Sequence, residues 1–255
     1  MHKSSPFSLE GHSALVTGSS MGIGNAIGKA MTEAGASVVF HGLEPRDTLD
    51  SPPRHYLSCD LTAFGTPEKF IDDALALQPA LSLLVCNAGS NFNAPFMDMS
   101  EERWDLTMNL NLKANYFVAQ AFARKMAERQ RSAAILFTGS VNGFQAELNS
   151  SAYDISKGGI VMMVRSVAME LADYDIRVNG IAPGLIYTDK TRPGIENTPG
   201  KRAHFERKIL RRRIGNPEDC AGAAVFLLSS AASYITGEII VIDGGLTVNQ
   251  VGTVH

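Results

Sequence analysis

The sequence predicts an α/β fold of the doubly wound kind, with a parallel sheet of about seven strands and helices on both faces. Two observations support this prediction: short and almost continuously apolar segments recur along the chain, and segments of helical length lie between them. Such strands are typical of sheets covered on both faces, and a helix is the usual connection between parallel strands. Because nothing in the composition of the 255 residues marks a boundary, we expect one domain over 1–255.

The expected elements alternate along the chain. Strands are expected at 13–17, 37–40, 55–57, 83–86, 134–137, 177–181 and 239–242, and helices at about 22–34, 101–130, 151–173 and 217–229. The stretch from Thr188 to about Lys201 is rich in Thr, Pro and Gly and breaks this pattern. Irregular segments of this length in a domain are often functional, so we expect a substrate loop and lid over 188–214.

Composition excludes several classes of function. Charged residues make up 19% of the chain and the formal net charge is −3, which provides no field for binding nucleic acid. Arg211 to Arg213 form a tight basic run, which we interpret as a solvated or carbonyl-capping cluster. Cys59, Cys86 and Cys220 are odd in number and widely spaced, so we expect neither disulfides nor a metal site.

The beginning of the chain and its hydrophobic pattern suggest a location. No apolar segment of signal-peptide length occurs near the start, and no run of eighteen apolar residues is present. We therefore expect a cytoplasmic protein with reduced thiols and a small-molecule partner, without membrane association.

A glycine-rich segment joins the first expected strand to the first expected helix. In Thr17–Gly24, Gly18 permits a tight turn, Gly22 lets a pyrophosphate approach the N-H groups at the start of the helix, and Gly24 allows the helix to pack closely on the strand. The G-x-x-x-G-x-G spacing differs from the usual dinucleotide fingerprint, and a plain structural turn is the alternative.

A tyrosine and a lysine stand four residues apart at the start of the helix expected at 151–173. Residues i and i+4 share a helix face, so the ammonium group of Lys157 could favour ionisation of the Tyr153 phenol. This pair would then exchange a proton near neutral pH. An amphipathic helix with a solvated lysine is the alternative.

Taken together, these motifs resemble the short-chain dehydrogenase/reductase family of the compact single-domain type, over essentially the full length. Thr17–Gly24 matches its T-G-x-x-x-G-x-G motif, and Cys86-Asn87-Ala88-Gly89 matches N-N-A-G with the first Asn replaced. Ser140 precedes Tyr153 by thirteen residues, and Pro183-Gly184 follows the sixth strand. The resemblance implies a Rossmann fold and an NAD(P)-dependent alcohol dehydrogenase or carbonyl reductase.

The resemblance also implies catalytic roles for four residues. Tyr153 would be the general acid or base, with Lys157 lowering its pKa and hydrogen-bonding the nicotinamide ribose. Ser140 would orient and polarise the substrate oxygen. Asn111, which aligns with the helix asparagine of the family, would hold a water in a proton relay from Lys157; by itself it reads as a residue that bonds the backbone of a helix kink.

The cofactor is expected to be NAD or NADP. The residues that the resemblance places around it are Gly18, Ser20, Met21, Gly22, Ile23, Gly24, Leu43, Glu44, Asp60, Leu61, Asn87, Ala88, Gly89, Tyr153, Lys157, Pro183, Gly184, Ile186 and Thr188. Taken singly, Asn87–Gly89 could be a strand-terminating turn, Asp60 a cap and Thr188 a loop residue. Glu44 could accept a ribose hydroxyl and would repel a phosphate, whereas Arg46 could attract one, and we favour NAD.

Amide side chains near the motifs suggest the substrate. They are Asn91, Asn93, Asn142, Gln145 and Asn149. Because buried polar groups penalise ligands that leave them unpaired, we expect a sugar, sugar acid or polyol, contacted by Ser140, Asn142, Asn149 and Tyr153. Placement of these amides on surface loops is equally compatible with the sequence. The alternatives are an NADPH-dependent 3-oxoacyl-carrier-protein reductase and a non-catalytic dinucleotide-binding protein.

The resemblance and the apolar helices at 101–130 and 151–173 lead us to expect a homotetramer.

Overall fold

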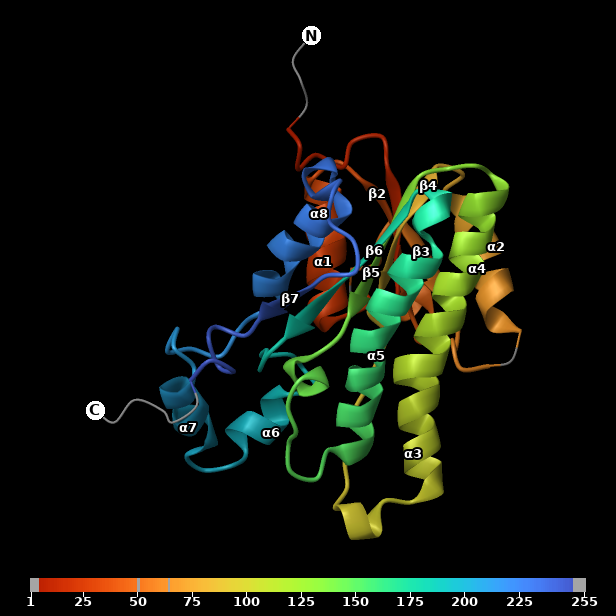
Figure 1. Cartoon of the computed structure of the whole chain (residues 1–255). Helices are drawn as coiled ribbons and strands as arrows, with labels where there is room; N and C mark the ends of the chain where they lie inside the picture. Colours follow the sequence, from red (N-terminus) through yellow and green to blue (C-terminus); the bar gives the residue numbers. More distant parts are fainter. Residues whose placement is uncertain (1–4, 50, 64, 250–255) are drawn as a thin grey trace.

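One parallel sheet organises the chain, in the strand order β3-β2-β1-β4-β5-β6-β7 (Figure 1). The computed structural model describes residues 5–49, 51–63 and 65–249. The strands are β1 (Ser13–Val16), β2 (Ser37–Gly42), β3 (His55–Ser58), β4 (Leu81–Cys86), β5 (Ala133–Thr138), β6 (Ile176–Pro183) and β7 (Ile239–Ile242). Strand order reverses at β1, which lies between β2 and β4. The carboxyl ends of strands at such a reversal form a crevice that suits a ligand.

Helices cover both faces of the sheet because the strand side chains alternate between two apolar clusters (Figure 1). α1 (Gly22–Glu33) and α8 (Ala221–Leu228) pack on one face, where Ala14 and Val16 of β1 meet Ile27 and Leu227. α2 (Thr66–Leu77), α4 (Asn115–Glu128) and α5 (Ser151–Glu170) cover the other face, which includes Leu15. The predicted seven-stranded, doubly wound single domain is confirmed.

The long helix expected at 101–130 is interrupted. α3 (Glu101–Met108) continues through a π-helical segment, Asn109–Ala114, into α4. Such π-helical segments are rare and occur frequently at functional sites. The candidate residue Asn111 lies in this one.

Three helices differ from the expected pattern. α2 is unexpected, although Phe70, Ile71, Ala74 and Leu75 recur on one face and are buried. α6 (Arg192–Glu196) and α7 (Lys201–Lys208) lie within the segment expected to be loop and lid; α7 has no buried residue, so no apolar periodicity marks it. Both lie beyond the carboxyl end of the sheet (Figure 1). No helix in the described parts of the chain is long and apolar enough to cross a membrane.

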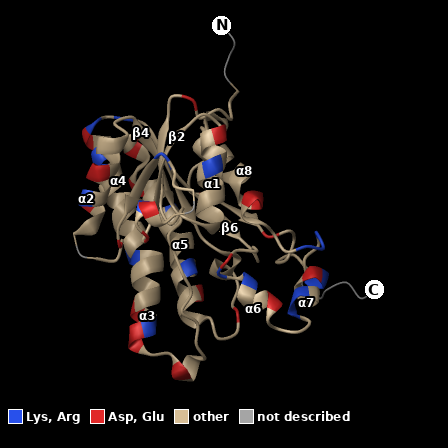
Figure 2. Ribbon diagram, turned by 180° about the vertical axis from the view of Figure 1, so that it is seen from behind, with Lys and Arg blue, Asp and Glu red and all other residues tan. Residues whose placement is uncertain are grey.

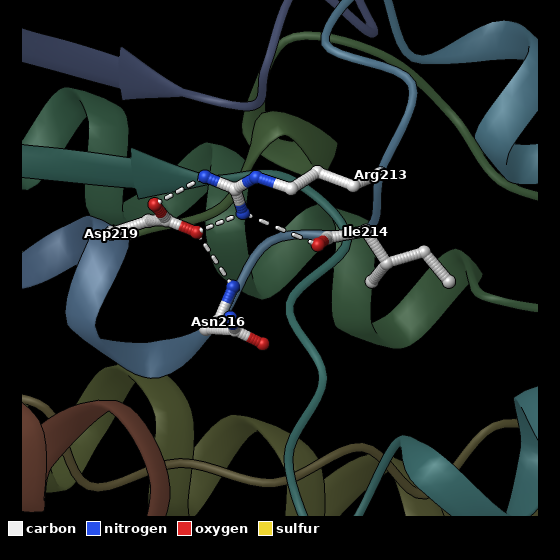
Figure 3. A network of polar contacts seen from close by, with 4 residues as sticks. All are labelled: Arg213, Ile214, Asn216 and Asp219. Atoms are coloured by element: carbon white, nitrogen blue, oxygen red, sulfur yellow. Dashed lines mark hydrogen bonds and ion pairs between the residues drawn. The ribbon is translucent and has the colours of Figure 1, made fainter.

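An ion pair holds the end of the segment 188–214 in place (Figure 3). The Arg213 guanidinium donates to both carboxylate oxygens of Asp219, at 2.6 and 2.7 Å, and the Asn216 N-H donates to the same carboxylate at 2.7 Å. The arginine holds the pKa of Asp219 down, at about 2. Arg212 donates to the carbonyl of Arg207 at the end of α7, as predicted for a capping arginine.

Candidate active site

A cavity of about 1480 Å³ opens along the carboxyl ends of β1, β2, β4, β5 and β6. The segment after β6, including residues of α6 and α7, forms another wall. Most of the expected site residues line this cavity. Three do not, namely Gly24, Asn111 and Asn149.

The glycine-rich turn leaves room for a phosphate group. Gly18 and Gly22 both have φ of +59°, and a Cβ on Gly18 would lie 2.8 Å from the Ala88 Cα. No side chain caps the start of α1, and its first turn holds no acidic residue. The N-H groups there are available to an anion, so the residues present fit the pyrophosphate of a dinucleotide.

Gly24 has the packing role that its position suggested. A Cβ there would lie 2.4 Å from both the Asn87 Nδ2 and the Gly18 carbonyl oxygen. Asn87 Nδ2 in turn donates to the carbonyls of Thr17 and Gly18 at 3.1 and 2.9 Å. Asn87 therefore ties the end of β4 to the turn after β1, while Asn87, Ala88 and Gly89 also line the cavity.

Tyr153 and Lys157 project from α5 into the cavity, opposite Ser140 at the end of β5. The Lys157 Nζ donates to the Thr138 carbonyl at 3.0 Å and lies 5.6 Å from the centre of the Tyr153 ring. Burial lowers the pKa of Lys157 to about 8. Burial raises the pKa of Tyr153, and a hydrogen bond with Ser140 opposes this shift.

These shifts correct one expectation about the pair. Lys157 was expected to lower the pKa of Tyr153, but that pKa is raised: burial raises it most, the charges of Glu147 and Asp154 raise it further, and the hydrogen bond with Ser140 does not outweigh them. The geometry still places a phenol, an alcohol and an ammonium group together at one wall of the cavity. This arrangement can move a proton to or from a bound oxygen.

Asn111 lies behind the cavity wall and is fully buried. Its Oδ1 accepts from the Ser90 N-H at 2.9 Å, and its Nδ2 donates to the Ser90 carbonyl at 2.8 Å and to the Ser156 Oγ at 3.1 Å. The backbone-bonding role is thus what the structure gives for Asn111. Asn115, which the sequence pattern did not single out, donates to the Asn111 carbonyl at 2.8 Å and to the Ala88 carbonyl at 3.0 Å.

The end of the cavity beside β2 carries negative charge. Ser20 Oγ lies 3.4 Å from a carboxylate oxygen of Glu44, and Leu43 is exposed. Asp60 lines the cavity, and its carboxylate also accepts hydrogen bonds from the N-H and the hydroxyl of Thr62 at 2.9 and 2.7 Å. Asp60 therefore also caps the turn that follows it, as its alternative interpretation predicted. Arg46 points elsewhere: its Nε donates to the Pro53 carbonyl at 3.1 Å.

The other end of the cavity is rich in amides. Asn91, Asn93, Asn142 and Gln145 line it, as expected. Asn149 does not line it: the residue is exposed in a turn, with φ of +62°. Asn142 Nδ2 is already used, because it donates to Asp154 at 2.7 Å and to Glu147 at 3.2 Å.

Two residues that line this cavity carry buried hydroxyl groups that the sequence pattern did not single out. Thr138 Oγ1 and Ser150 Oγ have no hydrogen-bond partner among the described residues. Buried polar atoms normally have a partner. Thr188, by contrast, is engaged: its N-H donates to the Thr191 Oγ1 at 2.9 Å, at the start of α6.

Comparison with known proteins agrees with this geometry. A family model described as enoyl-(acyl carrier protein) reductase matches residues 18–247. A 2-dehydro-3-deoxy-D-gluconate 5-dehydrogenase of Pseudoalteromonas atlantica is 36% identical over 248 residues, which cover 94% of this chain and 97% of the relative.

Solved structures are also similar. A gluconate 5-dehydrogenase of Burkholderia cenocepacia, in complex with NADP and tartrate, superposes with a TM-score of 0.90 at 29% identity, covering 95% of this chain and 98% of that one. A 3-oxoacyl (acyl-carrier-protein) reductase of Agrobacterium tumefaciens with NADP bound has a TM-score of 0.87 at 31% identity, covering 96% and 97%.

Proposed function

Because the chain belongs to the short-chain dehydrogenase/reductase family, we propose that it transfers a hydride between a nicotinamide dinucleotide and a secondary alcohol or ketone of a sugar acid. The observation that carries this proposal is the cluster of Ser140, Tyr153 and Lys157 on one wall of a cavity whose other end is a glycine-rich phosphate cradle. Members of the cluster come from two elements, and the sheet brings them together.

When bound, the nicotinamide ring supplies the hydride acceptor for alcohol oxidation. Tyr153, as phenolate, takes the proton of the substrate hydroxyl while the carbon loses its hydride, so that a ketone forms and the proton passes to solvent. Ser140 hydrogen-bonds the reacting oxygen and holds it against Tyr153. Lys157, fixed by the Thr138 carbonyl, keeps two further N-H donors for the nicotinamide ribose.

Cations and amides among the residues that line the cavity support an anionic, hydroxylated substrate. The cations are Lys190, Lys201 and Lys208, and His204 lies between the latter two on α7. Figure 2 shows Lys and Arg gathered on α7. A carboxylate can bind such cations, and the amides of Asn91, Asn93 and Gln145 suit sugar hydroxyl groups.

The segment 188–214 is proposed as the loop and lid over the substrate. Its Lys190 Nζ donates to the Gly89 carbonyl across the cavity at 3.2 Å, and the Arg213–Asp219 ion pair anchors its far end. Short helices held at two points in this way can close over a ligand without disturbing the sheet.

NAD is proposed as the preferred cofactor. The residues 18, 20–23, 41–44 and 59–62 line the cavity at its proposed adenosine end and include no Lys or Arg, whereas Glu44 and Asp60 are both acidic. A 2'-phosphate would bring about two negative charges to these carboxylates. Both solved structures described above contain bound NADP, so a preference for NAD would distinguish this chain from them.

Initial rates with three matched substrate classes test the proposed reaction. We expect turnover with sugar acids to exceed that with the corresponding neutral sugars, and Lys201→Met to raise KM for the acid on the order of tenfold, since a charge-assisted hydrogen bond is lost. Arg202→Met is the control, because Arg202 pairs with Glu206 and does not line this cavity.

3-Oxoacyl thioesters form the third class, and they test the alternative to which the name of the Agrobacterium relative points. Preference for these thioesters over every sugar acid would overturn the proposed substrate class. It would leave the dinucleotide chemistry in place.

A further inference from the structure

The turn that would hold the pyrophosphate is fastened to a buried histidine on the neighbouring strand. His41 lies near the end of β2 and its side chain is buried. Its Nδ1 lies 3.0 Å from the Gly18 N, and its Nε2 lies 3.1 Å from the Cys59 carbonyl oxygen. The imidazole therefore connects the turn after β1 to the end of β3.

One protonation state satisfies both contacts. A backbone N-H can only donate, so Nδ1 must be the unprotonated acceptor for Gly18; a carbonyl can only accept, so Nε2 must carry the proton for Cys59. This state is the neutral imidazole with its hydrogen on Nε2. Protonation of Nδ1 would place two donors opposite each other and release Gly18.

The backbone of His41 fastens the next residue of the turn as well. Its N-H donates to the Ser19 Oγ at 2.8 Å, and its carbonyl accepts from the Ser19 N-H at 2.7 Å. Ser19 Oγ donates in turn to the Val16 carbonyl at 2.6 Å. Two successive residues of the turn are thus held by one residue of β2.

The surroundings of the ring favour its neutral form. Burial lowers the pKa of His41; the Cys59 carbonyl and the carboxylates of Glu44 and Asp60 act in the opposite direction and do not outweigh it. From α2, the Phe70 ring packs edge-on at 4.9 Å between centroids. The charged groups that act on the ring, Glu44 after β2 and Asp60 after β3, both line the cavity.

We propose that His41 is a positioning residue for dinucleotide binding: its neutral imidazole holds Gly18 in the conformation that receives the pyrophosphate, and its protonation releases the turn. The inference requires that the chain binds a dinucleotide, but it does not depend on which substrate is oxidised. The direction of the pH dependence follows from the lowered pKa of His41. The bond to Gly18 is fully present above the ordinary histidine value of about 6.5 and is lost as the pH falls through the pKa of the folded protein.

Equilibrium binding of NADH between pH 5 and pH 8 tests this role without turnover. For the wild-type protein we expect Kd to rise at least threefold between pH 7.5 and the acid end. His41→Asn keeps an acceptor near the place of Nδ1 but does not titrate, so its Kd at pH 7.5 should stay within about threefold of wild type and vary less with pH. His41→Leu should raise Kd about tenfold or more at every pH. If His41→Asn keeps a Kd near that of the wild type while His41→Leu does not, the loss is due to the missing acceptor and not to a change of shape.

His12→Asn is the matched control. Like His41, His12 has its Nδ1 within hydrogen-bond distance of a partner, 2.9 Å from the Ser82 Oγ, and a pKa that burial and Arg131 lower, but it does not line the cavity. Its variant should keep the wild-type acid profile. A His41→Asn protein that also keeps that profile, or a folded His41→Leu protein with wild-type Kd, would overturn the proposal. If His41→Leu fails to fold, the His41→Asn profile decides.

Discussion

Tyr153 occupies an environment that makes its proton hard to remove. Burial raises its pKa, whereas burial lowers that of Lys157 to about 8. Both shifts have the same origin, since the low-dielectric wall of the cavity disfavours the charged form of each group. The hydrogen bond with Ser140 opposes the shift of the Tyr153 pKa and so favours the phenolate.

A pH dependence follows from the raised pKa. Alcohol oxidation needs the ionised phenol, so we expect kcat/KM for oxidation to increase by up to tenfold per unit as the pH rises from 7 towards the pKa in the complex. Carbonyl reduction needs the protonated phenol and should decline over the alkaline part of that range. Initial rates in both directions measure this, and an oxidation rate that falls with rising pH would contradict the assigned role.

Cofactor choice also belongs to single residues. We expect a higher kcat/KM with NAD than with NADP, and a shift towards NADP in the Leu43→Arg, Glu44→Ser double variant, because one change adds a phosphate ligand and the other removes repulsion. Arg46→Ala serves as the comparison. If the wild type prefers NADP and Arg46→Ala abolishes this preference, then Arg46 is the phosphate ligand and the interpretation of this turn is wrong.

The turn between β1 and α1 is the element that we expect to receive the pyrophosphate of a dinucleotide. Gly22 has φ of +59°, and a Cβ there would meet Thr188 at 3.6 Å, an ordinary contact. Gly22→Val should therefore obstruct the ligand more than the protein, and we expect the Kd for the dinucleotide to rise at least tenfold.

Gly11→Val separates this obstruction from backbone strain. Gly11 also has positive φ, at +81°, and nothing lies within 4 Å of the place that a Cβ would take there. The free energy of unfolding should fall by roughly 1–2 kcal/mol in both variants, because a residue with a Cβ is strained in the left-handed region of φ. Only Gly22→Val should lose affinity in a calorimetric titration. Equal affinities in the two folded variants would show that the turn does not receive the pyrophosphate.

The elements differ in how far the sequence could predict them. Strands such as β4 and β5 are apolar at nearly every position, and their expected bounds agree with the structure to within two residues at each end. The interruption of the helix at Asn109–Ala114 could not be predicted, because it depends on the bonds that Asn111 and Asn115 make to Ser90 and Ala88 across the fold. The exposed position of Asn149 could not be predicted either, because proximity in sequence to the motifs does not fix the direction of a turn.

At the scale of the whole molecule, an apolar stripe on α5 supports the expected self-association. Ile155, Met162 and Met169 recur every seven residues and are 52%, 58% and 83% exposed. On α4, Tyr116 and Phe117 are also more than a third exposed. Exposed apolar side chains arranged in this way are typical of interfaces. The homotetramer and the cytoplasmic location remain predictions.

Sedimentation velocity at micromolar concentration tests the assembly. We expect a species larger than the monomer, and a shift to a smaller species in Met162→Glu, because a charge in the stripe would be buried unpaired. Met97→Glu is the control, since Met97 is 90% exposed but lies outside α4 and α5. A monomeric wild-type protein would contradict the prediction.

Comparison of turnover and binding in Tyr153→Phe tests most directly whether this chain performs dinucleotide-linked oxidation through the cluster on α5. The change removes the ionisable oxygen and keeps the ring, so kcat should fall roughly 10²–10⁴-fold while the Kd for NADH stays within about twofold. Tyr174→Phe, at an exposed tyrosine away from the cavity, should behave as wild type. Turnover by Tyr153→Phe at a rate close to that of the wild-type protein would contradict the account.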